Sequence, residues 1–279
     1  MPLLDADTRC VVSYEDRLRD AVCVVTGAAR GVGRGIALAL GDAGATVYIT
    51  DRDSRSGSVS PLPGTIEDTA DDVTARGGRG IPVRVDHTVD AQVDALFSQV
   101  EAEHGGLHLL VANVFAGNEL PFRGGPLWEL PIAWWDLMFT AGVRAHLIAA
   151  HRAAGLLRAS SRGLIVLTSF SDSTPVMAGN AIYDLAMTAT NRLAHSLAHD
   201  FRPYGVTALA LSPGFVRTEA VMTAIDEAPP DTQSPEYVGR AVVALATDPD
   251  VTRHTGHVLH VGALAKVYDF TDIDGTQPP

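Results

Sequence analysis

Seven short apolar runs, separated by longer amphipathic stretches, constrain the fold more than any other feature of the sequence. Runs this short and this continuously apolar are typical of parallel strands whose two faces are both covered by helices. We expect strands at residues 21–26, 45–50, 80–85, 107–113, 163–169, 205–211 and 256–261. We expect helices at about 33–43, 65–77, 89–104, 132–159, 180–202 and 235–247.

Strands that alternate with helices are joined by right-handed crossovers, which place the helices on both faces of one sheet. The sequence therefore predicts an α/β fold, a Rossmann-type doubly wound parallel sheet of about seven strands with helices on both faces. The composition does not shift along the chain. We expect a single domain at 21–265, an N-terminal extension at 1–20 and a C-terminal tail at 266–279.

The charge balance and the cysteines argue against several classes of protein. The net charge is −12 and the basic residues are scattered, whereas phosphate binding needs clustered Lys and Arg. The N-terminus lacks the pattern of a signal peptide, and no apolar segment has the length that spans a bilayer. Cys23 lies in a run expected to be a buried strand, so no structural disulfide with Cys10 is expected. We therefore expect a cytoplasmic protein without a nucleic-acid or membrane partner.

The first expected strand ends in a glycine-rich turn, Thr26-Gly27-Ala28-Ala29-Arg30-Gly31-Val32-Gly33. Glycines here let the backbone bend tightly and let a pyrophosphate reach the free N–H groups at the start of the next helix. A strand before the turn and a helix after it make a dinucleotide site the specific interpretation. The residues expected to bind the dinucleotide in this turn are Thr26, Gly27, Arg30, Gly31, Val32 and Gly33.

Asp51, at the end of the second expected strand, bears on the choice of dinucleotide. A carboxylate in this place accepts hydrogen bonds from the adenosine ribose hydroxyls and repels a 2′-phosphate, which favours NAD. Arg30 and Arg52 act in the opposite direction, because a guanidinium at either position pairs well with a 2′-phosphate. NAD is therefore the predicted cofactor, and NADP is the less favoured alternative.

Motifs that follow the later strands make the chain resemble the short-chain dehydrogenase/reductase family over about residues 20–265. They are Asp86, Asn113, Tyr183 and Ser212-Pro213-Gly214-Phe215-Val216-Arg217-Thr218. Residues 33–50 and 244–259 are similar to the member 1 subgroup of mammalian dehydrogenase/reductases. The resemblance implies that Asp86 contacts the adenine, beside His87, and that Asn113 lines the cofactor cleft. It also implies that the nicotinamide carboxamide is held by Pro213, Gly214, Val216 and Thr218.

The resemblance further implies a catalytic tetrad, of which this chain keeps only the tyrosine cleanly. Tyr183 occupies the place of the family's proton-transferring tyrosine, but the lysine four residues later is replaced by Met187. A thioether cannot supply the positive charge that lowers a tyrosine pKa. The family's serine falls on Phe170, between Ser169 and Ser171, and its helix asparagine falls on Gly142. Tyr183 is therefore the expected acid or base, with Ser169 or Ser171 as a candidate hydroxyl partner.

Loss of three polar catalytic positions leaves more than one function open. The first hypothesis is an NAD(P)-binding oxidoreductase that acts on a carbonyl or a secondary alcohol of a small-molecule substrate. The alternatives are a non-redox enzyme of the same fold (a cyclase, dehydratase or isomerase) and a catalytically silent binding protein. The candidate substrate-pocket residues are Phe115, Phe170, Met187, His146 and Phe215. The resemblance also implies a homodimer or homotetramer formed through the long helices at 132–159 and 180–202.

No metal site is predicted. His195 and His199 have the spacing of a helical metal pair, but the intervening glutamate and an obvious third ligand are missing. The tail carboxylates Asp269, Asp272 and Asp274 do not have the spacing of a calcium loop. We expect these three carboxylates to be solvated.

Overall fold

A computed structural model describes residues 17–120, 124–160, 162–170, 180–225 and 227–279. Seven strands form one sheet in the order β3-β2-β1-β4-β5-β6-β7, and each pair of neighbours is parallel. The strands are β1 (Val22–Thr26), β2 (Thr46–Asp51), β3 (Arg79–Arg84), β4 (Leu109–Ala112), β5 (Leu164–Thr168), β6 (Thr207–Ser212) and β7 (Val258–His260). The predicted doubly wound parallel sheet is confirmed.

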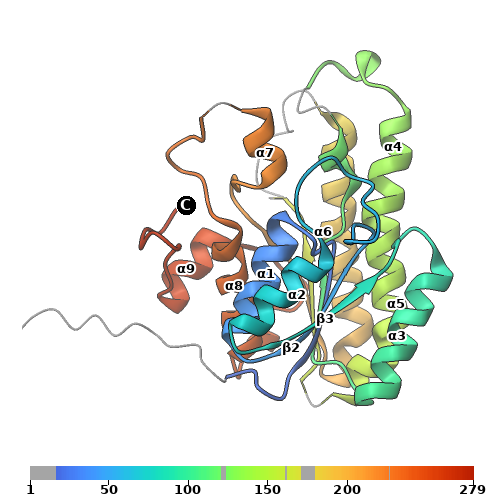
Figure 1. The fold of residues 1–279 in the computed structure, drawn as a ribbon, viewed down its shortest axis with the longest axis vertical. Helices are drawn as coiled ribbons and strands as arrows, with labels where there is room; N and C mark the ends of the chain where they lie inside the picture. The colour runs from blue at the N-terminus through green and yellow to red at the C-terminus, as the bar shows by residue number, and fades with distance from the viewer. Residues whose placement is uncertain (1–16, 121–123, 161, 171–179, 226) are drawn as a thin grey trace, which may run out of the picture.

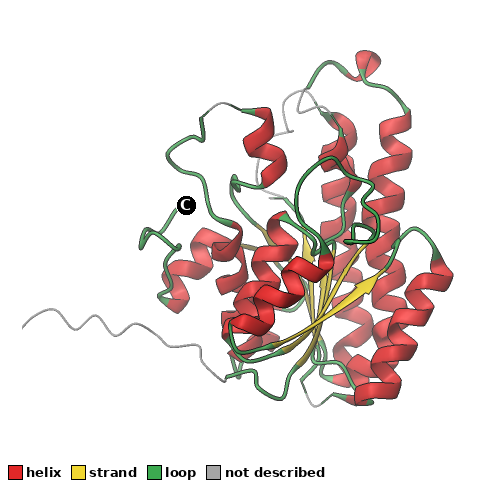
Figure 2. Cartoon of the chain, in the orientation of Figure 1, coloured by secondary structure: helices red, strands yellow, loops and turns green. Residues whose placement is uncertain are grey.

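Helices cover both faces of this sheet (Figures 1 and 2). One face carries α1 (Gly31–Asp42), α2 (Ile66–Ala75), α8 (Pro235–Thr247) and α9 (Val261–Tyr268), and the other carries α3 (Asp90–His104), α5 (Ala145–Ala159) and α6 (Ala181–Phe201). Two six-residue helices, α4 (Ala133–Met138) and α7 (Glu219–Ala224), lie nearer the carboxyl edge. Short 3₁₀ segments occupy Ala116–Glu119, Leu127–Glu129, Arg202–Tyr204 and Val251–His254. Within the described ranges, no helix combines the length and hydropathy needed to cross a membrane.

The predicted helix at 132–159 is interrupted rather than continuous. A π-helical segment, Phe139–Arg144, separates α4 from α5, and Ala141 within it has non-helical backbone angles (φ −94°, ψ 36°). Gly142 lies in this segment, and the ring of Phe115 packs so closely that a Cβ at Gly142 would be 3.0 Å from it. Local widening of this kind marks many functional sites, and periodicity alone does not predict it.

The end of the chain also differs from the sequence-based prediction. The seventh strand stops at His260, and Val261 begins α9, a helix that the apolar pattern did not reveal. Beyond α9, Phe270 is buried with its ring centroid 5.3 Å from that of Tyr237 in α8. The tail therefore packs onto the domain instead of trailing away from it.

Asp272 corrects the prediction that all three tail carboxylates are solvated. Its side chain is 1% exposed, whereas Asp269 and Asp274 are exposed as expected. The carboxylate accepts hydrogen bonds from the backbone N–H of Ser234, at 2.8 Å, and from the Ser234 hydroxyl. The Arg217 guanidinium lies 3.5 Å away. Spacing along the tail could not show this burial, because the partners come from the segment between β6 and α8.

We predict that Asp272→Ala lowers the free energy of unfolding by about 3 kcal/mol, because it leaves buried donors without their charged acceptor. Urea unfolding followed by circular dichroism measures the change. The matched control is Asp274→Ala, an exposed carboxylate two residues away, which should change stability by less than about 0.5 kcal/mol. Equal losses in the two variants would contradict the anchoring role of Asp272.

Candidate functional site

The carboxyl ends of the parallel strands meet at one edge of the sheet, where Asn113 connects three of them. Its backbone N–H donates to the hydroxyl of Thr26 at 2.8 Å. Its side-chain amide donates to the carbonyls of Thr26 and Gly27 at 3.0 and 3.1 Å, and its oxygen accepts from the Thr168 hydroxyl at 3.2 Å. Asn113 therefore fixes the shape of the glycine-rich turn and joins β1, β4 and β5 at the edge where ligands bind in such sheets.

The glycine-rich turn has a backbone that only glycine accommodates at its key positions. Gly27 and Gly31 have positive φ angles of 66° and 56°. At Gly33, a Cβ would be 2.2 Å from the carbonyl oxygen of Gly27. The start of α1 therefore lies against the end of β1 with no side chain between them, as close approach to a pyrophosphate requires.

The amino end of α1 is bound by a carboxylate from another part of the chain. Its cap residue, Arg30, makes no side-chain capping bond to the helix. Instead, the N–H of Gly31 donates to Oε2 of Glu219 over 2.8 Å. A carboxylate thus stands in at the place where the family resemblance puts the pyrophosphate, which shows that this helix end suits an anion.

Asp51 lies at the end of β2 and is half-buried beside the glycine-rich turn. It accepts hydrogen bonds from the N–H groups of Ala29, Arg52 and Asp53 at 3.3, 2.7 and 3.3 Å. Burial raises its pKa, although these three donors oppose the rise. Asp86, after β3, accepts from the backbone N–H and the hydroxyl of Thr88.

Arg30 is occupied by the loop that follows β2. Its guanidinium donates to the carboxylate of Asp53 at 2.6 Å, and Asp53 is almost fully buried. The remaining donors reach the carbonyls of Leu62, Pro63 and Gly64 at 2.9–3.3 Å. Arg30 therefore holds this loop closed. Arg52 also makes side-chain or ring interactions of its own, and its carbonyl accepts from Arg84.

The candidate catalytic tyrosine is enclosed by apolar side chains. The ring of Tyr183 makes edge contacts with Phe115 and Phe170, at centroid distances of 5.7 and 6.2 Å. Met187 follows one turn later on α6 and belongs to the same buried cluster, with Trp134 and Met138. Burial raises the pKa of Tyr183 to about 12. The loss of the lysine removes the charge that would lower this pKa, and the apolar surroundings raise it further.

The candidate hydroxyl partner that the structure describes, Ser169, directs its hydroxyl to the backbone of α6 and not to Tyr183. Ser169 is 6% exposed, and its hydroxyl donates to the backbone carbonyl of Met187 at 3.1 Å, so it points toward α6. Ser171 lies outside the described residues. Phe170 is half-buried, and its carbonyl accepts from the side chain of Asn191 at 3.0 Å. Among the described candidates, Tyr183 is thus the polar side chain that lies within the apolar cluster.

Two predicted site histidines, His87 and His146, are buried and hydrogen-bond to neighbouring residues. Burial lowers the pKa of both His87 and His146 to about 4, so both rings are neutral at physiological pH. Nε2 of His146 donates to the carbonyl of Val114 at 3.0 Å. Nε2 of His87 lies 2.8 Å from the Thr50 hydroxyl. Because that hydroxyl donates to a backbone carbonyl, the His87 nitrogen must be the donor.

Gln233 organises the segment after β6 and was not identified from the sequence. It is 0% exposed, and its backbone pairs with the carbonyl of Phe215 and the N–H of Arg217, both at 2.8 Å. Its side-chain oxygen accepts from the Gly214 N–H at 3.1 Å, and its nitrogen donates to the Pro279 carbonyl at 2.7 Å. Gln233 thus braces the predicted nicotinamide-binding residues from Pro213 to Thr218.

The other residues of that segment differ in burial and in their contacts. Val216 is 7% exposed and packs into the core cluster of the α1 face. The Thr218 hydroxyl caps α7 by accepting from the Val221 N–H at 3.3 Å. Phe215 is 36% exposed and makes contacts of its own. Pro213 is half-buried at the end of β6.

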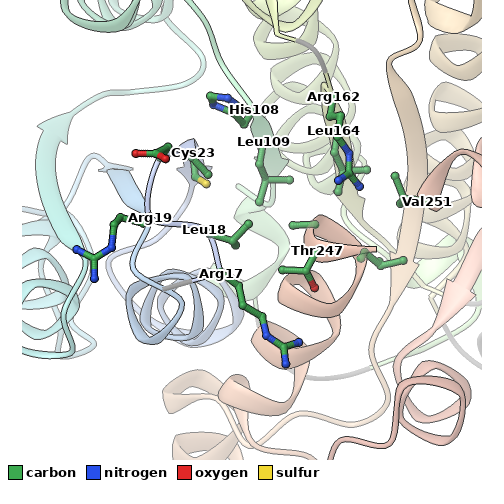
Figure 3. Close-up of a pocket in the computed structure, with 14 residues that line it drawn as sticks. Arg17, Leu18, Arg19, Cys23, His108, Leu109, Arg162, Leu164, Thr247 and Val251 are labelled. Atoms are coloured by element: carbon green, nitrogen blue, oxygen red, sulfur yellow. The ribbon is translucent and has the colours of Figure 1, made fainter. Parts of the chain in front are cut away.

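Two cavities lie away from the carboxyl edge. One, of about 500 Å³, is lined at the amino ends of β1, β4 and β5 by residues that include Cys23, Leu109 and Leu164 (Figure 3). Another, of about 370 Å³, is lined by His195, His199 and His257, among others. Among the described residues, no three His, Cys, Asp or Glu side chains are placed to hold a metal ion. The chemistry of this chain is therefore to be sought at the carboxyl edge, where the strand ends gather the predicted site.

Comparison with known proteins agrees with this geometry. Residues 27–263 match a family described as enoyl-(acyl carrier protein) reductase. Mouse dehydrogenase/reductase SDR family member 1 is 39% identical over 92% of this chain and 85% of its own length. The structure of a short-chain dehydrogenase from Mycobacterium thermoresistibile shares the fold, with a TM-score of 0.81 and 23% identity, over 94% of this chain and 91% of that chain. A metagenomic short-chain oxidoreductase in complex with NADP has a TM-score of 0.70 and 26% identity, over 88% and 98% of the two chains.

We predict that Met187→Lys brings the pKa of Tyr183 roughly 1–3 pH units lower, because an ammonium one helical turn away favours the phenolate. The difference in phenolate absorbance between this variant and the double variant with Tyr183→Phe isolates the titration of Tyr183. Met187→Leu keeps the site apolar and should leave the pKa near 12. An unchanged titration in Met187→Lys would mean that the ammonium turns away from the tyrosine.

Proposed function

Because the chain belongs to the short-chain dehydrogenase/reductase family, we propose that it is a nicotinamide-dependent reductase of small apolar carbonyl compounds. The observation that carries this proposal is the enclosure of Tyr183 by Phe115, Phe170 and Met187, which keeps its hydroxyl protonated. Apolar walls beside a polar group favour a substrate that is apolar except for its reacting oxygen. The name of the mouse relative, a dehydrogenase/reductase, agrees with an oxidoreductase.

The mechanism assigns proton donation to Tyr183. The glycine-rich turn and the segment from Pro213 to Thr218 would hold a reduced nicotinamide, which would supply hydride chemistry, and a carbonyl oxygen reduced there would need a proton. The Tyr183 hydroxyl donates a hydrogen bond to that oxygen and transfers its proton as negative charge develops there. An alkoxide is a stronger base than a phenolate whose conjugate acid has a pKa of about 12, so the transfer is downhill. Water then returns a proton to the tyrosine.

The same pKa disfavours the oxidation of alcohols at neutral pH. Oxidation would need the phenolate of Tyr183 as the base, and the raised pKa keeps the phenolate a small fraction of the population at pH 7. In relatives with a lysine in place of Met187, the positive charge is expected to enlarge this fraction. The oxidation rate is therefore expected to rise with pH, while the direction favoured at a given pH is set by the overall equilibrium between the carbonyl compound and the alcohol.

NADH is the cofactor that the site supports over NADPH. Asp51 places a carboxylate at the end of β2, where it can accept hydrogen bonds from the ribose hydroxyls and would repel a 2′-phosphate. Arg30, which the sequence offered as a partner for that phosphate, is held by Asp53 and by the carbonyls of residues 62–64. The NADP in the metagenomic structure is a property of that protein.

The apolar cluster also supports a second proposal, a non-redox enzyme of the same fold. Ser169 directs its hydroxyl to the carbonyl of Met187, so it is not oriented to polarise a substrate carbonyl. A site that binds by shape around a protonated tyrosine suits acid-catalysed dehydration or isomerisation. The activity test below distinguishes this proposal from the first.

We further propose that the enzyme is a cytoplasmic homodimer or homotetramer. Leu147 on α5 and Leu185 on α6 are 46% and 50% exposed, which supports association through these two helices. The buried free thiol of Cys23 is typical of a reducing compartment.

We predict that the purified protein oxidises NADH in the presence of aromatic or alicyclic ketones and aldehydes. Tyr183→Phe should lower kcat/KM by roughly 10²–10⁴, because the proton donor is lost. The reduction rate should be flat from about pH 6 to 9, whereas the oxidation rate should rise about tenfold per pH unit, since the pKa of Tyr183 lies near 12. Tyr204→Phe, at an exposed position, is the control. NADH binding without turnover of any carbonyl would refute the reductase and favour the non-redox enzyme.

We predict that Asp51→Ala weakens NADH binding roughly tenfold, because it removes charge-assisted hydrogen bonds to the ribose. The same change should bring the NADPH affinity closer to that of NADH, since the repulsion of the 2′-phosphate is removed. Isothermal titration with each nucleotide measures both effects. Asp71→Ala on α2 removes an exposed carboxylate and should change neither affinity. Unchanged NADH binding in Asp51→Ala would place the ribose elsewhere.

A further inference from the structure

We propose that Glu219 is an internal competitor of the cofactor, whose carboxylate occupies the pyrophosphate position until the dinucleotide displaces it. This inference rests on the proposed function, because it concerns the same dinucleotide site. It assigns to the first residue of α7 a role in setting cofactor affinity.

The first step of the argument is the way in which α1 begins. Helices α2, α6 and α8 are each capped by their own N-terminal side chain, those of Thr65, Asn180 and Ser234. Helix α1 has no such cap, and neither do α3 and α9; in α1 the side chain of the cap residue is directed to the loop at 53–64. The N–H groups at its start therefore need a partner from elsewhere.

The second step is the origin of that partner. The N–H of Gly31 donates to Oε2 of Glu219, which is 188 residues away in sequence. The carboxylate is negatively charged and lies at the positive end of the α1 dipole, as a phosphate group would. A glutamate oxygen on the Gly31 N–H and a pyrophosphate oxygen on the same N–H exclude one another. Their negative charges also repel each other at such short range.

The third step is that α7 can move away from the glycine-rich turn at a low cost in free energy. None of the six residues of α7 is buried, and Met222 is 42% exposed. Figure 1 shows α7 standing apart from the helices that cover the sheet. Thr218, just before α7, also packs toward Gly31, since a Cβ there would be 3.4 Å from the Thr218 methyl carbon. Withdrawal of Glu219 is therefore expected to move α7, which follows Thr218, while Thr218 stays at the turn.

A consequence separates this role from an ordinary stabilising contact. Removal of the carboxylate should destabilise the cofactor-free protein, because Gly31 loses its partner. The same removal should strengthen dinucleotide binding, because nothing has to be displaced. A residue that merely shapes the site would weaken both properties together.

The test compares Glu219→Gln and Glu219→Ala with the wild type by NADH titration calorimetry and by thermal unfolding without nucleotide. We expect NADH to bind roughly tenfold more tightly to Glu219→Ala. We expect the melting temperature of the cofactor-free variant to fall by a few degrees. Glu219→Gln removes the charge with the least change of shape and should shift both values in the same directions. Glu236→Gln, an acidic residue in the first turn of α8, controls for the change in net charge and should alter neither value.

The outcomes separate this inference from the proposed function. NADH binding that is equal or weaker in both Glu219 variants, with wild-type binding intact, would overturn the competition and leave the reductase standing. Binding that appears only in the variants would support the competition most strongly. Failure of NADH and NADPH to bind to any form would overturn the proposed cofactor site, and the competition with it.

Discussion

The unsatisfied N–H groups at the start of α1 are the constraint on which the site depends. Every α-helix begins with such N–H groups, and here the glycine-rich turn, with Gly33 directly against the carbonyl of Gly27, leaves them open to a ligand. Asn113 holds this turn from the side of β4, and Glu219 approaches it from α7. The same geometry that leaves room for a pyrophosphate therefore also leaves a helix end that favours an anion when no cofactor is bound.

The apolar replacements around Tyr183 form one packed unit. The ring of Phe115 lies where a side chain at position 142 would extend, since even a Cβ there would be 3.0 Å from it. The same ring makes an edge contact with Tyr183, and Phe170 makes another. A polar residue restored at one of these places would strain or desolvate its neighbours. The altered positions therefore pack as one unit, and a change at one of them is expected to disturb the others.

The fold was predictable from the sequence because the five inner strands are nearly continuous apolar runs, and all seven strands were predicted close to their observed places. The glycine-rich turn was predictable for a similar reason, since its residues are adjacent in the chain. The roles of Gln233 and Glu219 were not, because each acts on residues that come close only in the folded chain. The burial of Asp272 was missed for the same reason, and the π-helical break at Ala141 arises from packing that periodicity does not encode.

The C-terminal residues hold the segment between β6 and α8 in place. Asp272 holds Ser234 at the start of α8, and the Pro279 carbonyl holds the side chain of Gln233. Gln233 in turn fixes the segment at 213–218, which leads directly into Glu219 and α7. Gln233, which holds that segment, is buried, whereas α7 itself has no buried residue. This contrast lets α7 move while the predicted nicotinamide-binding residues stay in place, so cofactor entry need not disturb the positions that orient the cofactor.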